Sequence, residues 1–231
     1  MIYVLVDIDE TMLSVPPGIN AGTSNVMFKK VFGIDAHEEM IDNVGKTELG
    51  IIMEVLRKFG METETVPSEA YEIWGKSMDA ELKRHPVKIL PGMEEFLKTL
   101  SGNKNVKLTL LTGNSPARSE AKLRSAGFDK YFRDPETGKL FGVFGDETPV
   151  RGELINILSS RTKPGDSFVV VDDSLIGAKM SKDNDLTLIA MGTGKASAQD
   201  LQKYTPHYFE NLGNGKWQKA VEIVVSSEYE T

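Results

Sequence analysis

The chain lacks cysteine altogether, and it has only three histidines in 231 residues. Disulfide bonds, thiolate metal ligands and a cysteine nucleophile are therefore excluded. The histidines are scattered along the chain and show no spacing typical of a metal site. A chain without cysteine is compatible with a reducing compartment, and we expect a cytoplasmic protein.

The chain also lacks an excess of positive charge and any long apolar run. Asp and Glu number 34 against 27 Lys and Arg, which gives a formal net charge of −7 and argues against a nucleic-acid surface. No apolar run approaches the roughly 18 residues that span a bilayer, and no signal peptide is evident. We therefore expect no nucleic-acid or membrane partner, and a monomer or a homodimer.

A short apolar run opens the chain and predicts its first structural element. Residues 2–6 are apolar and rich in β-branched side chains, and the run ends abruptly at Asp7. This pattern is typical of a buried strand in a parallel sheet. Prolines and a glycine then break the chain near residue 18, and apolar spacings of three and four predict helices to about residue 84.

Beyond residue 88, strand and helix patterns alternate. Apolar runs at residues 106–111, 168–171 and 186–191 predict strands, with amphipathic segments between them. Such alternation implies parallel pairing of the strands. We therefore expect an α/β core domain with an inserted helical domain, at residues 1–15 and 85–231 for the core and 16–84 for the insertion.

Polar residues follow directly on three of the predicted strands. They are Asp7 and Asp9 after the first, Thr112 and Asn114 after the second, and Asp172 and Asp173 after the third. In open α/β sheets the active crevice lies beyond the carboxyl ends of the strands, so these side chains are expected to meet. Thr148 and Pro149 suit the first positions of a helix, which would place Arg151 in its first turn.

This constellation suits phosphoryl transfer through an aspartyl-phosphate. That chemistry needs a carboxylate nucleophile and a second acid that protonates the leaving oxygen. It also needs a divalent cation, because an anionic nucleophile approaches an anionic phosphate. A hydroxyl, backbone N–H groups and a fixed cation must bind the remaining phosphate oxygens. The sequence offers a candidate for each role.

The chain resembles the haloacid dehalogenase superfamily, in its phosphatase branch with an α-helical cap, and is similar to phosphoglycolate phosphatases. Four features carry the resemblance, in order: Asp7-Ile-Asp9-Glu-Thr11, Leu110-Leu-Thr112-Gly-Asn114, a basic residue, and Val171-Asp172-Asp173-Ser174. Each motif alone is weak, but their order and strand-end placement agree along nearly the whole chain. The resemblance implies a Rossmann-like, doubly wound parallel sheet with residues 16–84 as the cap.

The resemblance also implies roles for the acidic residues. Asp7 would be the nucleophile, and Asp9 the general acid and base. Asp7, the backbone carbonyl of Asp9 and Asp173 would ligate Mg²⁺. Asp172 would lie close to the ion or bind it through water.

Phosphate binding is implied for Thr112, Gly113 and Asn114. The third motif usually offers a lysine, and here Arg151 is the best-placed residue. Arginine keeps the charge and adds bidentate geometry. Lys163 is the rival candidate, although it lies very near the strand that follows it.

Two matters stay open in the sequence. Lys46 precedes Thr47 at a predicted helix start, so this pair either caps the helix or brings Lys46 from the cap to the distal part of a substrate.

The function is expected to be Mg²⁺-dependent hydrolysis of a small phosphorylated metabolite. A sugar-phosphate mutase of the β-phosphoglucomutase kind is the main alternative. A dehalogenase is disfavoured because it needs neither the acid at Asp9 nor a metal, and a non-catalytic binding protein would not need the complete set of acids.

Overall fold

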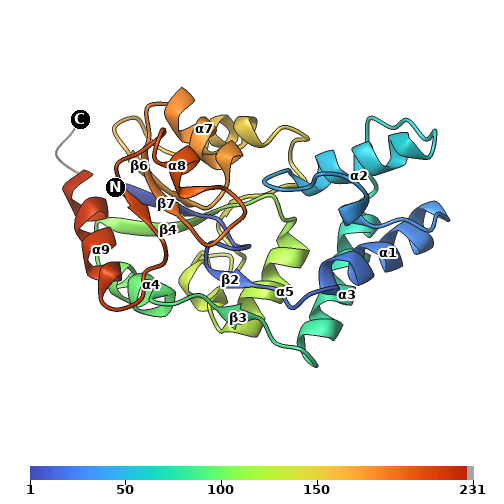
Figure 1. Cartoon of the computed structure of the whole chain (residues 1–231), viewed down its shortest axis with the longest axis horizontal. Coiled ribbons are helices and arrows are strands. Elements are labelled where there is room, and N and C mark those ends of the chain that lie inside the picture. The colour runs from blue at the N-terminus through green and yellow to red at the C-terminus, as the bar shows by residue number, and fades with distance from the viewer. Residues whose placement is uncertain (228–231) are drawn as a thin grey trace.

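A parallel β-sheet lies between helices in one half of the molecule (Figure 1). The computed structural model describes residues 1–227, within which the sheet has six strands in the order β5-β4-β1-β6-β7-β8. The strands are β1 Ile2–Val6, β4 Val106–Leu111, β5 Gly142–Val143, β6 Ser167–Asp172, β7 Thr187–Met191 and β8 Tyr208–Phe209. The Rossmann-like α/β fold that the sequence predicts is confirmed.

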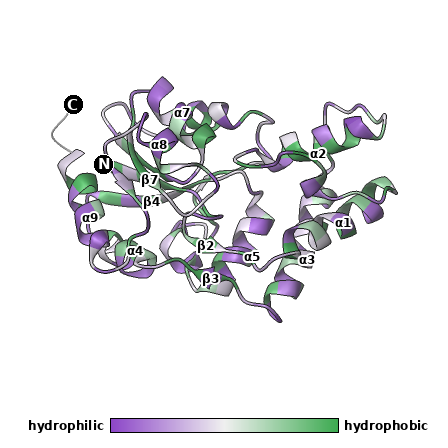
Figure 2. Cartoon of the chain, viewed as in Figure 1, coloured by the Kyte–Doolittle hydropathy of each residue, from purple (hydrophilic) through white to green (hydrophobic). Residues whose placement is uncertain are grey.

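Helices cover both faces of the sheet because side chains alternate along each strand. In β1, Val4 and Val6 join one hydrophobic cluster and Leu5 joins the other, as the two-residue period of a strand requires. The first cluster is completed by α4 Met93–Ser101, α5 Pro116–Ala126 and α9 Lys216–Ser226, and the second by α6 Leu154–Ser159, α7 Leu175–Asp183 and α8 Ala198–Leu201. The strands are mainly apolar, whereas the helices carry both kinds of residue (Figure 2).

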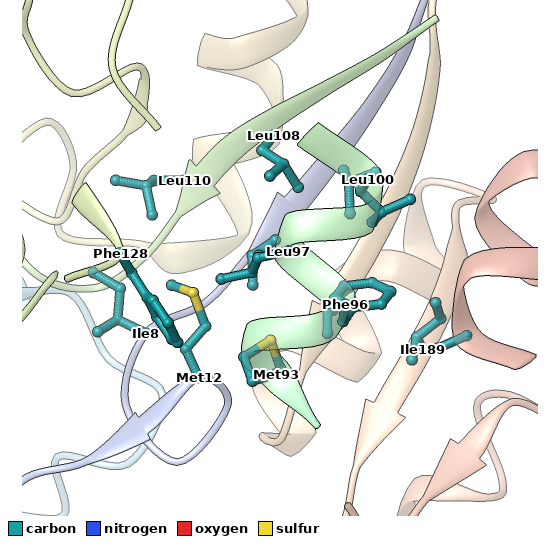
Figure 3. Packing of buried hydrophobic residues seen from close by; sticks show 14 of the residues in the cluster. Ile8, Met12, Met93, Phe96, Leu97, Leu100, Leu108, Leu110, Phe128 and Ile189 are labelled. Carbon is teal, nitrogen blue, oxygen red and sulfur yellow. The ribbon is translucent and has the colours of Figure 1, made fainter. Parts of the chain in front are cut away.

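Helix α4 shows how the predicted spacing becomes packing. Met93, Phe96, Leu97 and Leu100 recur at intervals of three and four, and all are fully buried. They pack against side chains of the neighbouring strands, including Leu108 of β4 (Figure 3). Truncating such a side chain to alanine typically costs about 2–5 kcal/mol, so this layer holds the sheet rigidly behind its polar edge.

The register of the sheet brings the polar strand ends to one level. Val6 pairs with Leu110 of β4 and with Val171 of β6. Asp7 therefore lies level with Asp172 at the end of β6 and with Leu111 at the end of β4, one residue before Thr112. Strand β1 is central, and the chain builds outward from it on both sides. This is the place where open α/β sheets form their ligand crevice.

Residues 16–84, here called the helical segment, lie at the end of the molecule away from α9 (Figure 1). They contain α1 Ile19–Phe32, the 3₁₀ turn Glu38–Met40, α2 Glu48–Lys58 and α3 Ser68–Leu82, with a hydrophobic cluster of their own. Two short antiparallel strands, β2 Leu13–Ser14 and β3 Lys88–Ile89, pair where the chain leaves and re-enters the core. These strands are too short to give a periodic signal in the sequence.

One predicted helix start is wrong. Thr148 and Pro149 do not open a helix, because Val150 is extended and a 3₁₀ turn, Arg151–Glu153, precedes α6. The Thr148 hydroxyl instead donates a hydrogen bond to Glu153 at 2.5 Å. Arg151 still lies in a first helical turn, but in the 3₁₀ turn rather than in the α-helix.

No helix within residues 1–227 combines the length and the apolar character needed to cross a bilayer.

Candidate active site

Three carboxylates meet where β1 and β6 end. Ligand atoms of Asp7, Asp172 and Asp173 all lie within 4.8 Å of one another, and each side chain is at least nine-tenths buried. Thr11 donates a hydrogen bond to Asp173 Oδ1 at 2.7 Å. The pairing of β1 with β6 thus brings Asp7 to two acids that lie more than 160 residues further along the chain.

Arg151 supplies the positive charge beside these acids. Its Nη2 lies 3.0 Å from Asp7 Oδ2 and 2.6 Å from Asp172 Oδ2, and the side chain is buried. The other oxygen of Asp172 accepts hydrogen bonds from the Ser174 N–H and hydroxyl. Lys163 is exposed in the turn before β6, where its backbone N–H donates to Asp166. Of the two candidates for the basic position, the structure therefore brings Arg151 to the acids.

The charge of this cluster is not balanced by Arg151. Burial raises the pKa of Asp7 from 3.8 to about 6, although Arg151 opposes the shift. Burial and the neighbouring Asp172 likewise raise the pKa of Asp173. Buried oxygen ligands with excess negative charge are what a hard divalent cation such as Mg²⁺ prefers. The residues present therefore fit such an ion.

Asp9 forms its ion pair with a different cation, Lys122. Lys122 Nζ lies 2.7 and 2.6 Å from the two Asp9 oxygens, and the Asn114 amide donates to Asp9 Oδ2 at 2.7 Å. Burial opposes ionisation of Asp9, but Lys122 and Arg118 together hold its pKa below the usual value. In the protein without substrate, these contacts therefore favour the carboxylate form of Asp9, and 34% of its side chain is exposed.

The loop after β4 has one fully buried hydroxyl and two residues that line the cavity. The Thr112 hydroxyl is fully buried and accepts hydrogen bonds from the Asn114 backbone and side-chain amides. Gly113 and Asn114 line the cavity in front of the acids. Among the expected phosphate-binding residues, Thr112 thus lies behind the loop, and Gly113 and Asn114 face the cavity.

The acids open into a cavity of about 550 Å³ between the sheet and the helical segment. The sheet side contributes Asp7, Asp9, Arg151 and Asp173, and the helical segment contributes residues from 38–48. A volume of this size suits a small molecule. The cavity therefore places a ligand directly against the strand-end acids.

A family model described as haloacid dehalogenase-like hydrolase matches residues 3–185, which include all four motifs. The chain belongs to this family. It is a hydrolase by that membership. No curated protein matches the chain.

Solved structures show the same fold at low identity. A protein of Clostridium acetobutylicum assigned as a phosphatase is 19% identical, with 95% of this chain and 98% of that chain covered and a TM-score of 0.61. One of Bacteroides vulgatus assigned as a β-phosphoglucomutase is 18% identical, with 100% and 91% covered and a TM-score of 0.61. A CbbY variant of Rhodobacter sphaeroides, in complex with xylulose-1,5-bisphosphate, is 15% identical, with 92% and 95% covered and a TM-score of 0.64.

The helical segment of this haloacid dehalogenase-like hydrolase contacts two loops of the core through its backbone. The N–H of Glu48 donates to the Gly113 carbonyl, and the N–H of Leu49 to the Gly145 carbonyl, both at 2.8 Å. A Cβ on Gly113 would lie 2.1 Å from the Lys46 carbonyl oxygen. The start of α2 therefore packs directly on the loop that follows β4.

Lys46 lines the cavity, as expected for a residue that reaches a substrate, but its Nζ lies 2.5 Å from Glu54. The capping alternative for Thr47 is confirmed, because its hydroxyl oxygen accepts a hydrogen bond from the Gly50 N–H at 3.2 Å. The two alternatives for the pair are compatible: Thr47 caps α2, and Lys46 lies at the cavity wall.

A glycine-rich turn after β7 closes around the acids. A Cβ on Gly194 would lie 1.8 Å from Asp173 Oδ2. Gly177, in the first turn of α7, approaches the other acid in the same way: its Cβ would lie 2.2 Å from the Asp172 carboxylate. The Thr193 hydroxyl donates to the backbone carbonyl of Glu10. This turn therefore packs closely on Asp173 and on the loop that follows β1.

Sequence reasoning missed the two buried cations of α5. Lys122 contacts Asp9, and Arg118 pairs with Glu38 at 2.8 Å and Glu48 at 3.2 Å, both in the helical segment. Their spacing of four residues places them on one face of a helix that starts at the end of the motif strand. Two cations on one face of this helix were the feature of the sequence that could have indicated contacts with the acids. That feature is a weak indication, because a charged helix face is usually solvated.

Proposed function

We propose that the protein is a Mg²⁺-dependent phosphatase that hydrolyses a small phosphorylated metabolite through an aspartyl-phosphate. The observation that supports this best is the pair Asp7 and Asp9 at one cavity wall, each contacted by its own buried cation. Asp7 lies beside Arg151 at the cavity, where it could attack a phosphate as the nucleophile. Asp9, two residues further along the chain, lies at the same cavity and could carry the proton.

In the first step, a carboxylate oxygen of Asp7 attacks the phosphorus, and the bond from phosphorus to the leaving oxygen breaks. Protonated Asp9 donates its proton to that oxygen, which departs as an alcohol. In the second step, Asp9 takes a proton from water, and the resulting hydroxide attacks the phosphorus of the aspartyl-phosphate. Inorganic phosphate leaves and the Asp7 carboxylate is restored, so atoms and charges balance.

The metal site in this proposal consists of Asp7, Asp173 and the backbone carbonyl of Asp9. Asp172 is already held by Ser174 and Arg151, which suits a residue that lies close to the ion or binds it through water. Bound Mg²⁺ would offset the charge between the phosphate and Asp7. Arg151 would neutralise phosphate oxygens beside it, and the backbone at Gly113 and Asn114 would bind the others.

We further propose that the helical segment is the cap that covers the substrate. It packs on the loop after β4 and supplies one wall of the cavity. A closed cap excludes bulk water and strengthens electrostatic interactions inside the site. Lys46 is the residue of this wall that we expect to face the distal part of the substrate.

The test is hydrolysis of p-nitrophenyl phosphate by the wild type and by Asp7→Asn, with Mg²⁺ and with a chelator. We expect turnover only by the wild type with Mg²⁺. Asp183→Asn, at the exposed end of α7, serves as the control and should match the wild type. Steady-state phosphate release by pure Asp7→Asn protein would contradict the aspartyl-phosphate mechanism, and full activity with chelator would contradict the metal.

A further inference from the structure

Lys122 is a lysine with none of its surface exposed. Its ammonium group has three hydrogen-bond partners: both oxygens of Asp9, at 2.7 and 2.6 Å, and Asn114 Oδ1 at 2.8 Å. An ammonium group has three N–H donors, so every donor is used. All three hydrogen bonds of the ammonium group therefore go to Asp9 and to the Asn114 amide, which itself contacts Asp9.

Stability alone does not account for a lysine at this position. A fully buried lysine is rare, because removing its charge from water is costly. Replacing a buried ion pair by apolar residues of similar size is often neutral or stabilising. The neighbouring helix position, Leu123, packs in the apolar core. The charge at residue 122 is therefore best explained by what it does to Asp9.

The hydrogen bonds hold the Asp9 carboxylate in one orientation. Oδ2 accepts from both Lys122 and Asn114, whereas Oδ1 accepts from Lys122. The Asn114 amide is fixed in turn, because its nitrogen also donates to Thr112 Oγ1 at 3.0 Å. Oδ1 therefore keeps more of its acceptor capacity than Oδ2, and it is the oxygen available to carry a proton.

Lys122 acts from behind Asp9 and not on the substrate. Asp9 and Asn114 line the cavity, but Lys122 is not among the described residues that do so. Arg151, by contrast, lines the cavity next to Asp7. The two cations therefore lie in different places: Arg151 lies at the cavity beside Asp7, and Lys122 lies behind Asp9.

We propose that Lys122 is a positioning residue that, together with Asn114, fixes Asp9 so that Oδ1 exchanges the proton with the leaving oxygen and with water. This inference rests on the proposed phosphatase function. The observed ion pair is the form that Asp9 has after it donates its proton, and also the form that receives a proton from water. Lys122 thus holds the Asp9 carboxylate in the orientation that it has between the two proton transfers.

The test compares two esters of nearly the same shape. Nitrophenolate is a weak base that leaves without a proton, whereas phenolate is more basic and benefits from protonation. Lys122→Met removes the charge at similar volume, and Lys122→Gln is a second variant with an amide. In both variants we expect kcat/KM for phenyl phosphate to fall at least about tenfold further than for p-nitrophenyl phosphate, a part of the typical general-acid contribution.

Two further measurements separate positioning from general structural damage. On an Asp9→Asn background, Lys122→Met should cause no additional loss with phenyl phosphate. Inhibition by inorganic phosphate with Mg²⁺ should stay within about twofold, because Lys122 does not face the cavity. Arg124→Met, on the exposed side of the same helix, is the matched control and should leave both esters unaffected.

The outcomes are distinct from those that test the phosphatase function. If the wild type hydrolyses neither ester, the proposed function fails. If the wild type is active but both esters lose activity equally in the Lys122 variants, or phosphate inhibition weakens, the positioning role is overturned. If neither variant folds, Lys122 is a stability residue and the proposal is rejected.

Discussion

Replacing Asp7 by asparagine should make the metal-free protein more stable while it removes turnover. Burial raises the pKa of Asp7 from 3.8 to about 6 in the folded protein. The folded state therefore binds the proton more tightly than the unfolded state, so stability falls as the pH rises from about 4 to about 6. Above that range the charge costs about 3 kcal/mol, since each pKa unit corresponds to about 1.4 kcal/mol.

The asparagine variant does not carry this charge. Its side chain has nearly the same size, and Arg151 keeps its contact with Asp172 at 2.6 Å. At pH 8 with chelator we expect the variant to be more stable by about 3 kcal/mol, or about 6–12 °C in Tm for a chain of this length. At pH 4, where Asp7 is protonated in the folded state and still partly protonated in the unfolded state, the difference should shrink to below about 1 kcal/mol.

The measurement is urea and thermal unfolding of both proteins at pH 8 and pH 4, with chelator present. Asp183→Asn controls for the loss of any surface charge and should show no comparable pH-dependent gain. An Asp7→Asn protein that is no more stable than the wild type at pH 8, or whose gain persists at pH 4, would refute the reasoning. Added Mg²⁺ should stabilise the wild type at pH 8 more than the variant, because the ion binds the carboxylate that the variant lacks.

Two further changes test other parts of the site. Arg151→Ala should lower kcat/KM for p-nitrophenyl phosphate at least about tenfold, since it removes a charge-assisted contact to the phosphate, whereas Lys163→Ala should have no effect; equal kinetics for the two would reverse this assignment. Gly194→Ala should weaken Mg²⁺-dependent stabilisation, because the added Cβ would displace the Asp173 carboxylate, whereas Gly22→Ala, with open space around it, should bind Mg²⁺ as the wild type does in the same thermal titration.

Local patterns predicted much of the fold because they depend on near neighbours in the chain. The strand predicted at residues 106–111 agrees with β4, and the strand predicted at residues 2–6 agrees with β1. The start of α6 was missed because an extended Val150 and a 3₁₀ turn replace the expected cap. The pairing of β2 with β3 was missed because two-residue strands have no period.

The sequence by itself determined which residues stand at the strand ends, since an apolar run that stops at an acid is a local feature. It therefore brought Asp7, Asp9, Asp172 and Asp173 into one hypothesis before any contact was known. Tertiary structure alone decided which cation serves which acid: Arg151 contacts Asp7, and Lys122 contacts Asp9. A lysine on a helix is ordinarily solvated, and only the packing of α5 against the strand-end loops shows that this one is buried.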